Sequence, residues 1–482
     1  MLKSTRPSSL RAALLALPKT LDETYQRMLN NINEADRSYA LTLLRWLAYA
    51  QSPLSLLELA EADIIDPKDD PAADGLVDVD DRGDWADTFN ILAGFVTIDG
   101  VQEREVDRGV DSAGDVSMTH ANRQIEESIR VRLAHFSVKE HLESARILGS
   151  DAKYFHLDPL REHRYLTYSC LVYLTHYTAS PLKTSTKTDL AAFPLLVHAA
   201  KTWAHHASLQ QRSNGVREMV FLQSEPRKRG WLEIYTPERS WVQPFKRSNW
   251  GIGTALYYAS LLGLEAVVQD LLSGRADVNT QGGYYGNALQ AASGCGHEKV
   301  VQILIDVGAD VNAQGGYYGN ALQAASIRGH EKVAQMLIDA GADVNARGGE
   351  ALDSALQAAT FGGNAKVVQV LIEAGVDVNA HGGGGYSNAL HAASALGHEK
   401  VVQVLIDAGA DLNAQDEGLY SNALLAASAK GDEKVVQMLI DAGVDVNAQE
   451  GQFYNNALQA ASEEGHEKEQ TSTLTDDAIP VR

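Results

Sequence analysis

Apolar positions in the second half of the chain recur at the spacing of short amphipathic helices. Asn287 is a good N-cap for a helix over residues 288–293, whose alanines would let a second helix approach closely. Gly296 can take the left-handed conformation that ends this first helix. A second helix is expected from about Glu298. Its apolar stripe consists of Val301, Leu304 and Ile305.

The same pattern returns every 33 or 34 residues along the second half of the chain. Gly308 is expected to end the second helix, and residues 311–316 to turn outward as a β-finger. A repeated Ala-Leu pair begins at residues 255, 288, 321, 355, 389, 423 and 457. An Asp-(Val/Leu)-Asn triplet begins at residues 277, 310, 343, 377, 411 and 445. Because one unit cannot bury its apolar stripe alone, neighbouring units must stack and share a core.

The period and the sequence inside each unit resemble the ankyrin repeat. The resemblance implies a mainly α fold, an α-helical ankyrin solenoid over residues 249–466, with six full units and one partial unit. The family's Thr-Pro-Leu-His signature is altered to Asn-Ala-Leu-Gln in most units, and only Asn388–His391 keeps the histidine. In the last unit the polar residues 467–482 replace the second helix, which predicts either a frayed cap or a truncated gene product, with a disordered tail.

Comparison of the units with one another separates scaffold positions from candidate contact positions. The residue just before each first helix is bulky in most units, as at Tyr285 and Tyr318, which favours packing over ligand contact. The residue preceding it, and the two residues before the glycine that ends the first helix, differ between units. In ankyrin stacks these positions line one concave face. The candidate partner-binding residues are Tyr284, Tyr317, Arg328, Phe361, Leu396, Leu419, Lys430 and Phe453. The alternative is drift on a solvated face.

The N-terminal half has a different pattern. Helices are expected in residues 1–60, where Thr20 with Glu23 and Ser55 with Glu58 form capping boxes. The following segments are an acidic loop over 64–84, strands over 94–99 and 129–134 around a polar insertion at 102–124, and a helix over 136–148. Helices followed by a strand pair suit a winged-helix-like module in residues 1–148. Apolar runs predict a mainly helical linker region in residues 149–248.

Several short sequence segments in this half resemble segments of fungal signalling NTPases of the STAND class, the NACHT–ankyrin proteins. They are Leu17–Tyr25, Leu133–Leu142, Tyr168–Leu174, and Phe193–Leu196 with Trp203 and His206. In that family the segment that corresponds to Leu17–Tyr25 follows the nucleotide-binding NACHT domain. The winged-helix module of the family is regulatory. The resemblance covers nearly the whole chain. It implies a component or fragment of a sensor in which ankyrin repeats recognise a ligand in self/non-self recognition.

The NTPase chemistry of that family is missing from these 482 residues. No Gly-x-x-x-x-Gly-Lys-(Ser/Thr) loop occurs, so nothing cradles nucleotide phosphates. We therefore expect a non-catalytic protein–protein interaction protein, acting as a decoy, an adaptor in trans or a fragment. The alternative is a signalling NTPase whose NACHT domain is absent from this chain.

The charge and the cysteine content limit the class of binding partner and the cellular compartment that we expect. The net charge is −22, of which residues 251–482 contribute −18. This acidic balance favours basic protein partners and disfavours nucleic acid. Two cysteines cannot build a disulfide framework, which predicts the cytoplasm or nucleus, and no apolar run approaches the length of a membrane span.

The other residue patterns that could carry chemistry do not amount to a metal-binding or catalytic site. Asp78–Gly83 is only partly similar to a calcium loop, because Arg82 takes a ligand position. His198, His205 and His206 lack further metal ligands nearby, and Cys295 lacks a histidine partner for nucleophilic work. We expect no enzyme activity, no cofactor and no metal.

Overall fold

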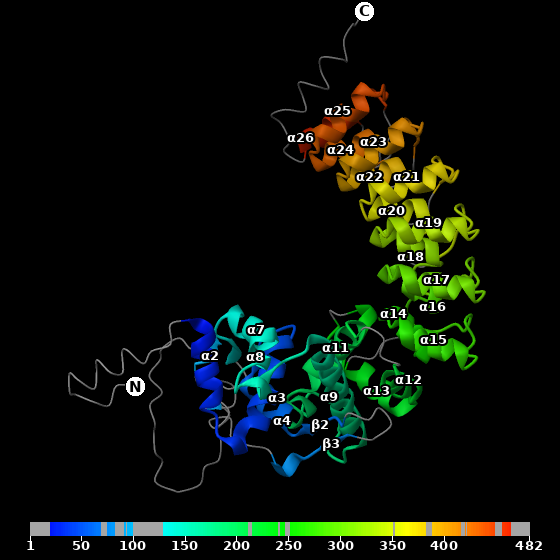
Figure 1. Ribbon diagram of the computed structural model, residues 1–482. Coiled ribbons are helices and arrows are strands. Elements are labelled where there is room, and N and C mark those ends of the chain that lie inside the picture. The colour runs from blue at the N-terminus through cyan, green and yellow to red at the C-terminus, as the bar shows by residue number, and fades with distance from the viewer. Residues whose placement is uncertain are drawn as a thin grey trace, which may run out of the picture. The chain divides into compact units, whose positions relative to one another are not determined.

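The computed structural model describes residues 20–68, 75–81, 91–92, 94–99, 129–210, 215–239, 242–245, 251–349, 352–381, 388–415, 420, 422–448 and 456–463. The chain divides into two compact units, Met1–Arg247 (unit 1) and Ser248–Arg482 (unit 2). The described residues are mainly helical with little sheet, which confirms the predicted fold class (Figure 1). None of the described helices combines the length and the apolarity needed to span a membrane. The finer division of the chain at residues 148, 248 and 466 stays a prediction.

Two of the first described helices of unit 1 begin where the sequence signals place them. α2 (Leu21–Asn30) begins where the Thr20 hydroxyl accepts a hydrogen bond from the Glu23 backbone N–H at 3.1 Å. α4 (Leu56–Asp63) begins with a full capping box between Ser55 and Glu58. Between them lie the short 3₁₀ helix η1 (Glu34–Asp36) and α3 (Arg37–Tyr49), which buries Leu43, Leu44 and Trp46.

A three-stranded antiparallel sheet has the order β1-β5-β4. Its strands are β1 (Leu54–Ser55), β4 (Val96–Asp99) and β5 (Arg130–Leu133), so the expected strand pair is confirmed, with Ile98 opposite Val131. The insertion expected at 102–124 lies outside the described residues. The expected loop at 64–84 was wrong in part. It contains β2 (Ile65–Asp66) and β3 (Leu76–Val77), which pair because Ile65 and Val77 are buried.

The rest of unit 1 is helical and is organised around one long buried helix, α9 (Pro159–Ala179). α9 packs against α11 (Leu196–Ser208), α12 (Val216–Gln223), α13 (Glu225–Ile234) and α3 (Figure 1). Trp203 and Trp231 are buried between them, and the Trp231 indole N–H donates to the Ala200 carbonyl at 2.8 Å. The remaining elements are η2 (Val79–Asp81), α7 (Phe136–Glu143), α8 (Ala145–Leu148), η3 (Lys153–Phe155), α10 (Asp189–Ala192) and η4 (Pro237–Arg239).

Unit 2 is a stack of helix pairs, with inner helices along one side and outer helices along the other (Figure 1). The inner helices are α14 (Ala255–Leu261), α16 (Ala288–Cys295), α18 (Ala321–Arg328), α20 (Ala355–Phe361), α22 (Ala389–Leu396), α24 (Ala423–Lys430) and α26 (Ala457–Glu463). The outer helices are α15 (Glu265–Ser273), α17 (Glu298–Asp306), α19 (Glu331–Asp339), α21 (Ala365–Glu373), α23 (Glu399–Asp407) and α25 (Glu433–Asp441).

The caps of the repeated unit agree with the sequence prediction, whereas its finger does not. Asn287 caps α16 by accepting from the Gln290 N–H, and Gly296 ends the helix with φ 75°. The β-finger expected at 311–316 was wrong in its secondary structure. The described part of this segment forms turns and one isolated bridge between Gly315 and Gly319.

The Asp-(Val/Leu)-Asn triplets hold neighbouring units together. Within a triplet, Asp310 Oδ1 accepts from the Asn312 N–H at 3.0 Å and closes a turn. Asn312 Oδ1 then accepts from the Asp343 N–H of the next unit at 2.8 Å. The equivalent bond recurs from Asn279 to Asp310, Asn345 to Asp377, Asn379 to Asp411 and Asn413 to Asp445, all within 3.0 Å. The triplets are therefore scaffold elements, a role that their periodicity alone did not reveal.

Candidate protein-binding surface

The structure places the sequence-predicted contact residues unequally. Phe361 is 47% exposed at the end of α20, and Arg328 and Lys430 are exposed at the ends of α18 and α24. Tyr317 and Leu396 are half-buried. Leu419 and Phe453 lie outside the described residues. Arg328, Phe361, Leu396 and Lys430 belong to four successive inner helices, and Tyr317 lies in the turn before α18. These five residues therefore lie along the inner side of the stack.

Tyr284 differs from the other candidates because it packs inside the stack. Only 8% of it is exposed, and its ring stacks on that of Tyr317 with centroids 4.9 Å apart and planes 21° apart. The Tyr318 ring meets Tyr284 edge-on at 5.9 Å. Burial is the largest cause of the raised pKa of the Tyr284 hydroxyl. Tyr284 thus supports its neighbours and offers a partner little surface.

The position before each inner helix is mostly a packing position, as expected from its bulk. Tyr285 and Tyr318 are buried, with ring centroids 5.6 Å apart. Tyr420 packs against Leu425, Ala429 and Ala460 across a unit boundary. Ile252, at the start of the stack, is the exception because it is exposed.

Arg328 is joined to this tyrosine cluster. Burial alone would lower the pKa of the Arg328 guanidinium, but hydrogen bonds and charge interactions with the Tyr285 and Tyr318 hydroxyls raise it. The guanidinium therefore lies near these two hydroxyls, although the residue is exposed at the end of α18. Arginine and aromatic residues are enriched in protein interfaces.

Gly294 is one of the two residues before the glycine that ends α16, a position predicted to contact a partner, and the structure shows that it has a packing role. A Cβ atom at this helical position would lie 2.3 Å from Cε1 of Tyr285. Glycine is needed there because the neighbouring tyrosine ring occupies the space. The variation at this position between units therefore follows local packing as well as surface exposure.

Charge is segregated between the two rows of helices. The inner helices α14 to α24 contain no aspartate or glutamate, and their charged residues are Arg328 and Lys430. Five of the six outer helices begin with glutamate, and five end with an acidic residue. The described outer row is therefore acidic, and the inner helices α14 to α24 carry two cations and no carboxylate.

The histidines considered in the sequence as candidate metal ligands are mostly buried in unit 1. His206 is fully buried, with its Nδ1 3.0 Å from Nδ1 of His163, and burial lowers its pKa to about 3. Burial also lowers the pKa of His198 to about 4 and raises that of the Cys170 thiol to about 12. Cys295 is half-buried. Within the described residues, no group of three or more His, Cys, Asp or Glu side chains could hold a metal ion.

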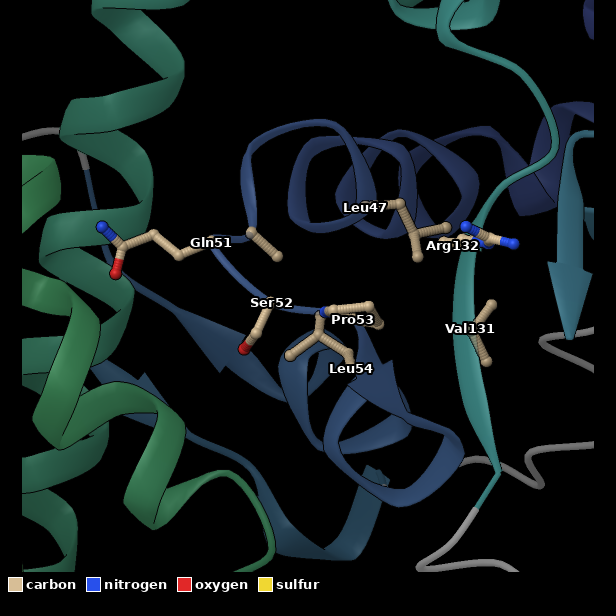
Figure 2. Close-up of a pocket in the computed structure, with 8 residues that line it drawn as sticks. Leu47, Gln51, Ser52, Pro53, Leu54, Val131 and Arg132 are labelled. Atoms are coloured by element: carbon tan, nitrogen blue, oxygen red, sulfur yellow. The ribbon is translucent and has the colours of Figure 1, made fainter. Parts of the chain in front are cut away.

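A small pocket of about 120 Å³ lies between α3 and β5 of unit 1. Leu47 comes from α3, Ser52, Pro53 and Leu54 lead into β1, and Val131 and Arg132 come from β5 (Figure 2). Its lining is mainly aliphatic, and its volume is well below the roughly 300 Å³ at which ligand pockets begin. The pocket reads as a packing gap beside the sheet.

Comparison with known proteins agrees with the repeat architecture. Residues 256–348 and 349–416 match the model of ankyrin repeats (3 copies), and residues 421–450 match the model of a single ankyrin repeat. The ankyrin repeats are thereby confirmed. Because ankyrin repeats are a protein-binding scaffold, they imply protein partners and a role in protein–protein interaction.

One curated relative is the azaphilone pigments biosynthesis cluster protein L of Monascus ruber, with 37% identity over 293 residues. The match covers 57% of this chain and 56% of that protein, so the chain spans just over half the length of this relative. Similar solved structures include the human ASB11 ankyrin repeat domain, with TM-score 0.41 and 20% identity over 49% of this chain and 100% of that domain. The ankyrin repeat domain of Bcl-3, an IkappaB family member, has TM-score 0.38 and 25% identity over 43% of this chain and 92% of that domain. The resemblance to STAND proteins stays a prediction.

Proposed function

We propose that unit 2 binds a protein partner through an inner-helix face formed by Tyr317, Arg328, Phe361, Leu396 and Lys430. The observation that carries this proposal is the exposure of Phe361, 47%, beside Leu356 on the same helix at 3%. Repeated positions such as Leu356 are buried and nearly constant between units, whereas the exposed positions differ. An exposed aromatic side chain on a rigid scaffold supports a contact role, because such residues are enriched in interface cores.

The placement of charge favours one partner chemistry on this face. Net charge alone predicted a basic partner, but the inner helices α14 to α24 hold no acidic side chain. A partner seated on the inner helices would meet Phe361 and Leu396 between the cations Arg328 and Lys430. We therefore propose a partner segment that presents apolar side chains together with carboxylates.

Affinity capture with the full chain tests this function. Partners captured by the wild type and identified by mass spectrometry should be lost with a triple variant, Arg328→Ala with Phe361→Ala and Lys430→Ala. Truncation of anchor residues usually weakens binding by at least about 2 kcal/mol, or roughly thirtyfold. Circular dichroism should show an unchanged fold, because all three residues are exposed.

A matched control carries the same kinds of change on the outer row. Val307 is 50% exposed at the end of α17, and Lys332 and Lys366 are exposed lysines of α19 and α21. The variant Val307→Ala with Lys332→Ala and Lys366→Ala should keep every partner. Equal loss of partners from both variants, or from neither, would contradict a specific inner-helix face.

We further propose that this binding serves signalling or recognition, in the manner that the STAND resemblance implies, with residues 1–148 of unit 1 as a regulatory winged-helix-like module. The support is the order of the resembling sequence segments, together with an antiparallel β1-β5-β4 sheet whose strands β4 and β5 follow α3 and α4 in the chain. Because these residues include no Walker loop, the expressed chain should not bind ATP in calorimetry. Micromolar ATP affinity would favour the alternative of a nucleotide-dependent switch. A cytoplasmic or nuclear site of action is proposed from the two free cysteines, and a fluorescent fusion would test it.

A further inference from the structure

A second pocket of unit 1 is lined by cations and aromatic rings. It has a volume of about 150 Å³ and lies between α3, the start of α9 and the loop after β2. We name it the α9 pocket after its main wall. Its lining includes the four cations Arg45, Lys68, Arg161 and Arg164, the carboxylate of Asp66, and the rings of Tyr165 and Tyr168. Four cationic side chains around one small cavity contrast with the net charge of the chain, −22.

The spacing of the α9 residues explains why they meet in one place. Arg161, Arg164, Tyr165 and Tyr168 stand at positions i, i+3, i+4 and i+7, which share one helix face. They belong to the first three turns of a 21-residue helix, whose backbone dipole adds positive potential at that end. Asp158 caps the helix by accepting from the Arg161 N–H at 2.9 Å.

Two of the four cations are already neutralised by carboxylates. Arg45 lies 2.7 Å from the buried Glu162, and Lys68 pairs with Asp66, whose pKa is held down chiefly by its hydrogen bond with Lys68. Arg161 and Arg164 form no ion pair with any carboxylate in the part of the chain that the structure describes. Counted over the described residues, the pocket lining therefore keeps a surplus of two positive charges.

Arginine side chains pack against the tyrosine walls of the pocket. The Arg45 guanidinium lies 4.5 Å from the Tyr165 ring centroid, and the Arg217 guanidinium lies 4.3 Å from that of Tyr168. Arg217 also donates to the carbonyl oxygens of Pro67 and Lys68, and Lys68 has a left-handed backbone with φ 52°. A non-glycine residue holds this conformation only where its surroundings fix it. These contacts order the tyrosine and Lys68 walls, whereas Arg161 and Arg164 are exposed.

We propose that the α9 pocket binds a phosphate group. The two surplus guanidinium charges match the charge of a phosphate dianion, and guanidinium forks donate in pairs to its oxygens. The volume of about 150 Å³ is small and suits one phosphate group. The group could arrive as free phosphate or as an aryl phosphate monoester, whose ring the tyrosine walls would contact.

Isothermal titration calorimetry of the full chain at pH 7.5 tests the proposal. Inorganic phosphate and phenyl phosphate are titrated separately, with sodium chloride of equal ionic strength as the blank. We expect saturable binding, weakened at least about tenfold in the double variant Arg161→Gln with Arg164→Gln, because each substitution removes charge-assisted hydrogen bonds. The lysine double variant at the same positions keeps the charge but not the fork, and should lose part of the affinity.

Arg229→Gln is the matched control, because Arg229 is an exposed helical arginine of α13 outside the pocket lining. It should bind phosphate as the wild type does. Tighter binding of phenyl phosphate supports the proposal with a monoester as the source, and equal binding supports it with free phosphate. The proposal is overturned if neither compound binds saturably at millimolar concentration, or if the glutamine double variant, shown to be folded by circular dichroism, binds as the wild type does.

Discussion

The side-chain amide of Asn364 donates to the carbonyl oxygen of Ile327 at 3.0 Å, and this bond joins the start of α21 to the end of α18 in the preceding unit. Histidine makes the same link in three other units. His297 Nε2 lies 3.0 Å from the Leu261 carbonyl oxygen, and His330 and His398 repeat the contact at 3.2 Å. Asp432 stands at the equivalent place before α25, and a carboxylate cannot donate to a carbonyl.

Exchange of the amide and the carboxylate at these two positions should change stability in opposite directions. Asp432→Asn should stabilise unit 2 by about 0.5–1.5 kcal/mol, because the amide can donate to the preceding helix while keeping the cap that Asp432 gives to the Val435 N–H. Asn364→Asp should destabilise it by about 1–3 kcal/mol. Urea unfolding followed by circular dichroism measures both. A lower midpoint for Asp432→Asn would show that its carboxylate is better placed than a donor.

Gly294→Ala should destabilise unit 2 by about 1–3 kcal/mol, because the new Cβ would overlap the Tyr285 ring. Gly251→Ala is the control, since no atom lies within 4 Å of the Cβ position there, and its midpoint should stay near that of the wild type. Tyr285→Leu in the Gly294→Ala background should restore part of the loss. Thermal unfolding of the wild type and the three variants measures these differences. An unchanged stability of Gly294→Ala would mean that the Tyr285 ring moves aside freely.

Unit 1 should lose stability on mild acidification. The pKa values of the buried His198 and His206 lie at about 4 and about 3, below the unfolded value of about 6.5. The unfolded chain therefore binds more protons, so stability falls as the pH falls through 6.5, by about 1.4 kcal/mol for each histidine at pH 5.5. All six tryptophans precede residue 251, so tryptophan fluorescence during urea unfolding reports mainly on unit 1.

The double variant His198→Gln with His206→Gln is the comparison for this pH effect. Its midpoint should fall less between pH 7.5 and 5.5 than that of the wild type. Burial raises the pKa values of Glu162 and Glu218, and this acts in the opposite sense, but it is common to both proteins and cancels in the comparison. An identical pH response in both proteins would exclude these imidazoles as its cause.

Ala365→Glu should add a missing ion pair on the outer row. Lysine at the start of one outer helix pairs with glutamate of the preceding one, as Lys366 does with Glu331 at 3.3 Å, but the place opposite Lys400 holds Ala365. Because such pairs are exposed, the gain should be only about 0.5 kcal/mol and should shrink at high salt. A double-mutant cycle with Lys400→Met isolates the pair. A gain that persists without Lys400 would come from the helix start instead.

The periodic features of unit 2 could be predicted from sequence because each depends on residues close together in the chain. The cap at Asn287 and the left-handed Gly296 are examples. The burial of Tyr284 could not be predicted by comparing single positions, because it depends on tyrosine pairs in two consecutive units. The α9 pocket was also missed. Arg45 and Lys68 reach Arg161 only through the tertiary packing of segments about a hundred residues apart.

The asparagines of the Asp-(Val/Leu)-Asn triplets tie neighbouring units through the turns, and the ties at the ends of the inner helices use backbone carbonyl oxygens, such as that of Phe361. Side chains such as Phe361 and Lys430 can therefore be exchanged without loss of any of these ties. A gene for such a chain can change what it recognises by point substitution, or by gaining and losing whole units, while the register of the stack is preserved.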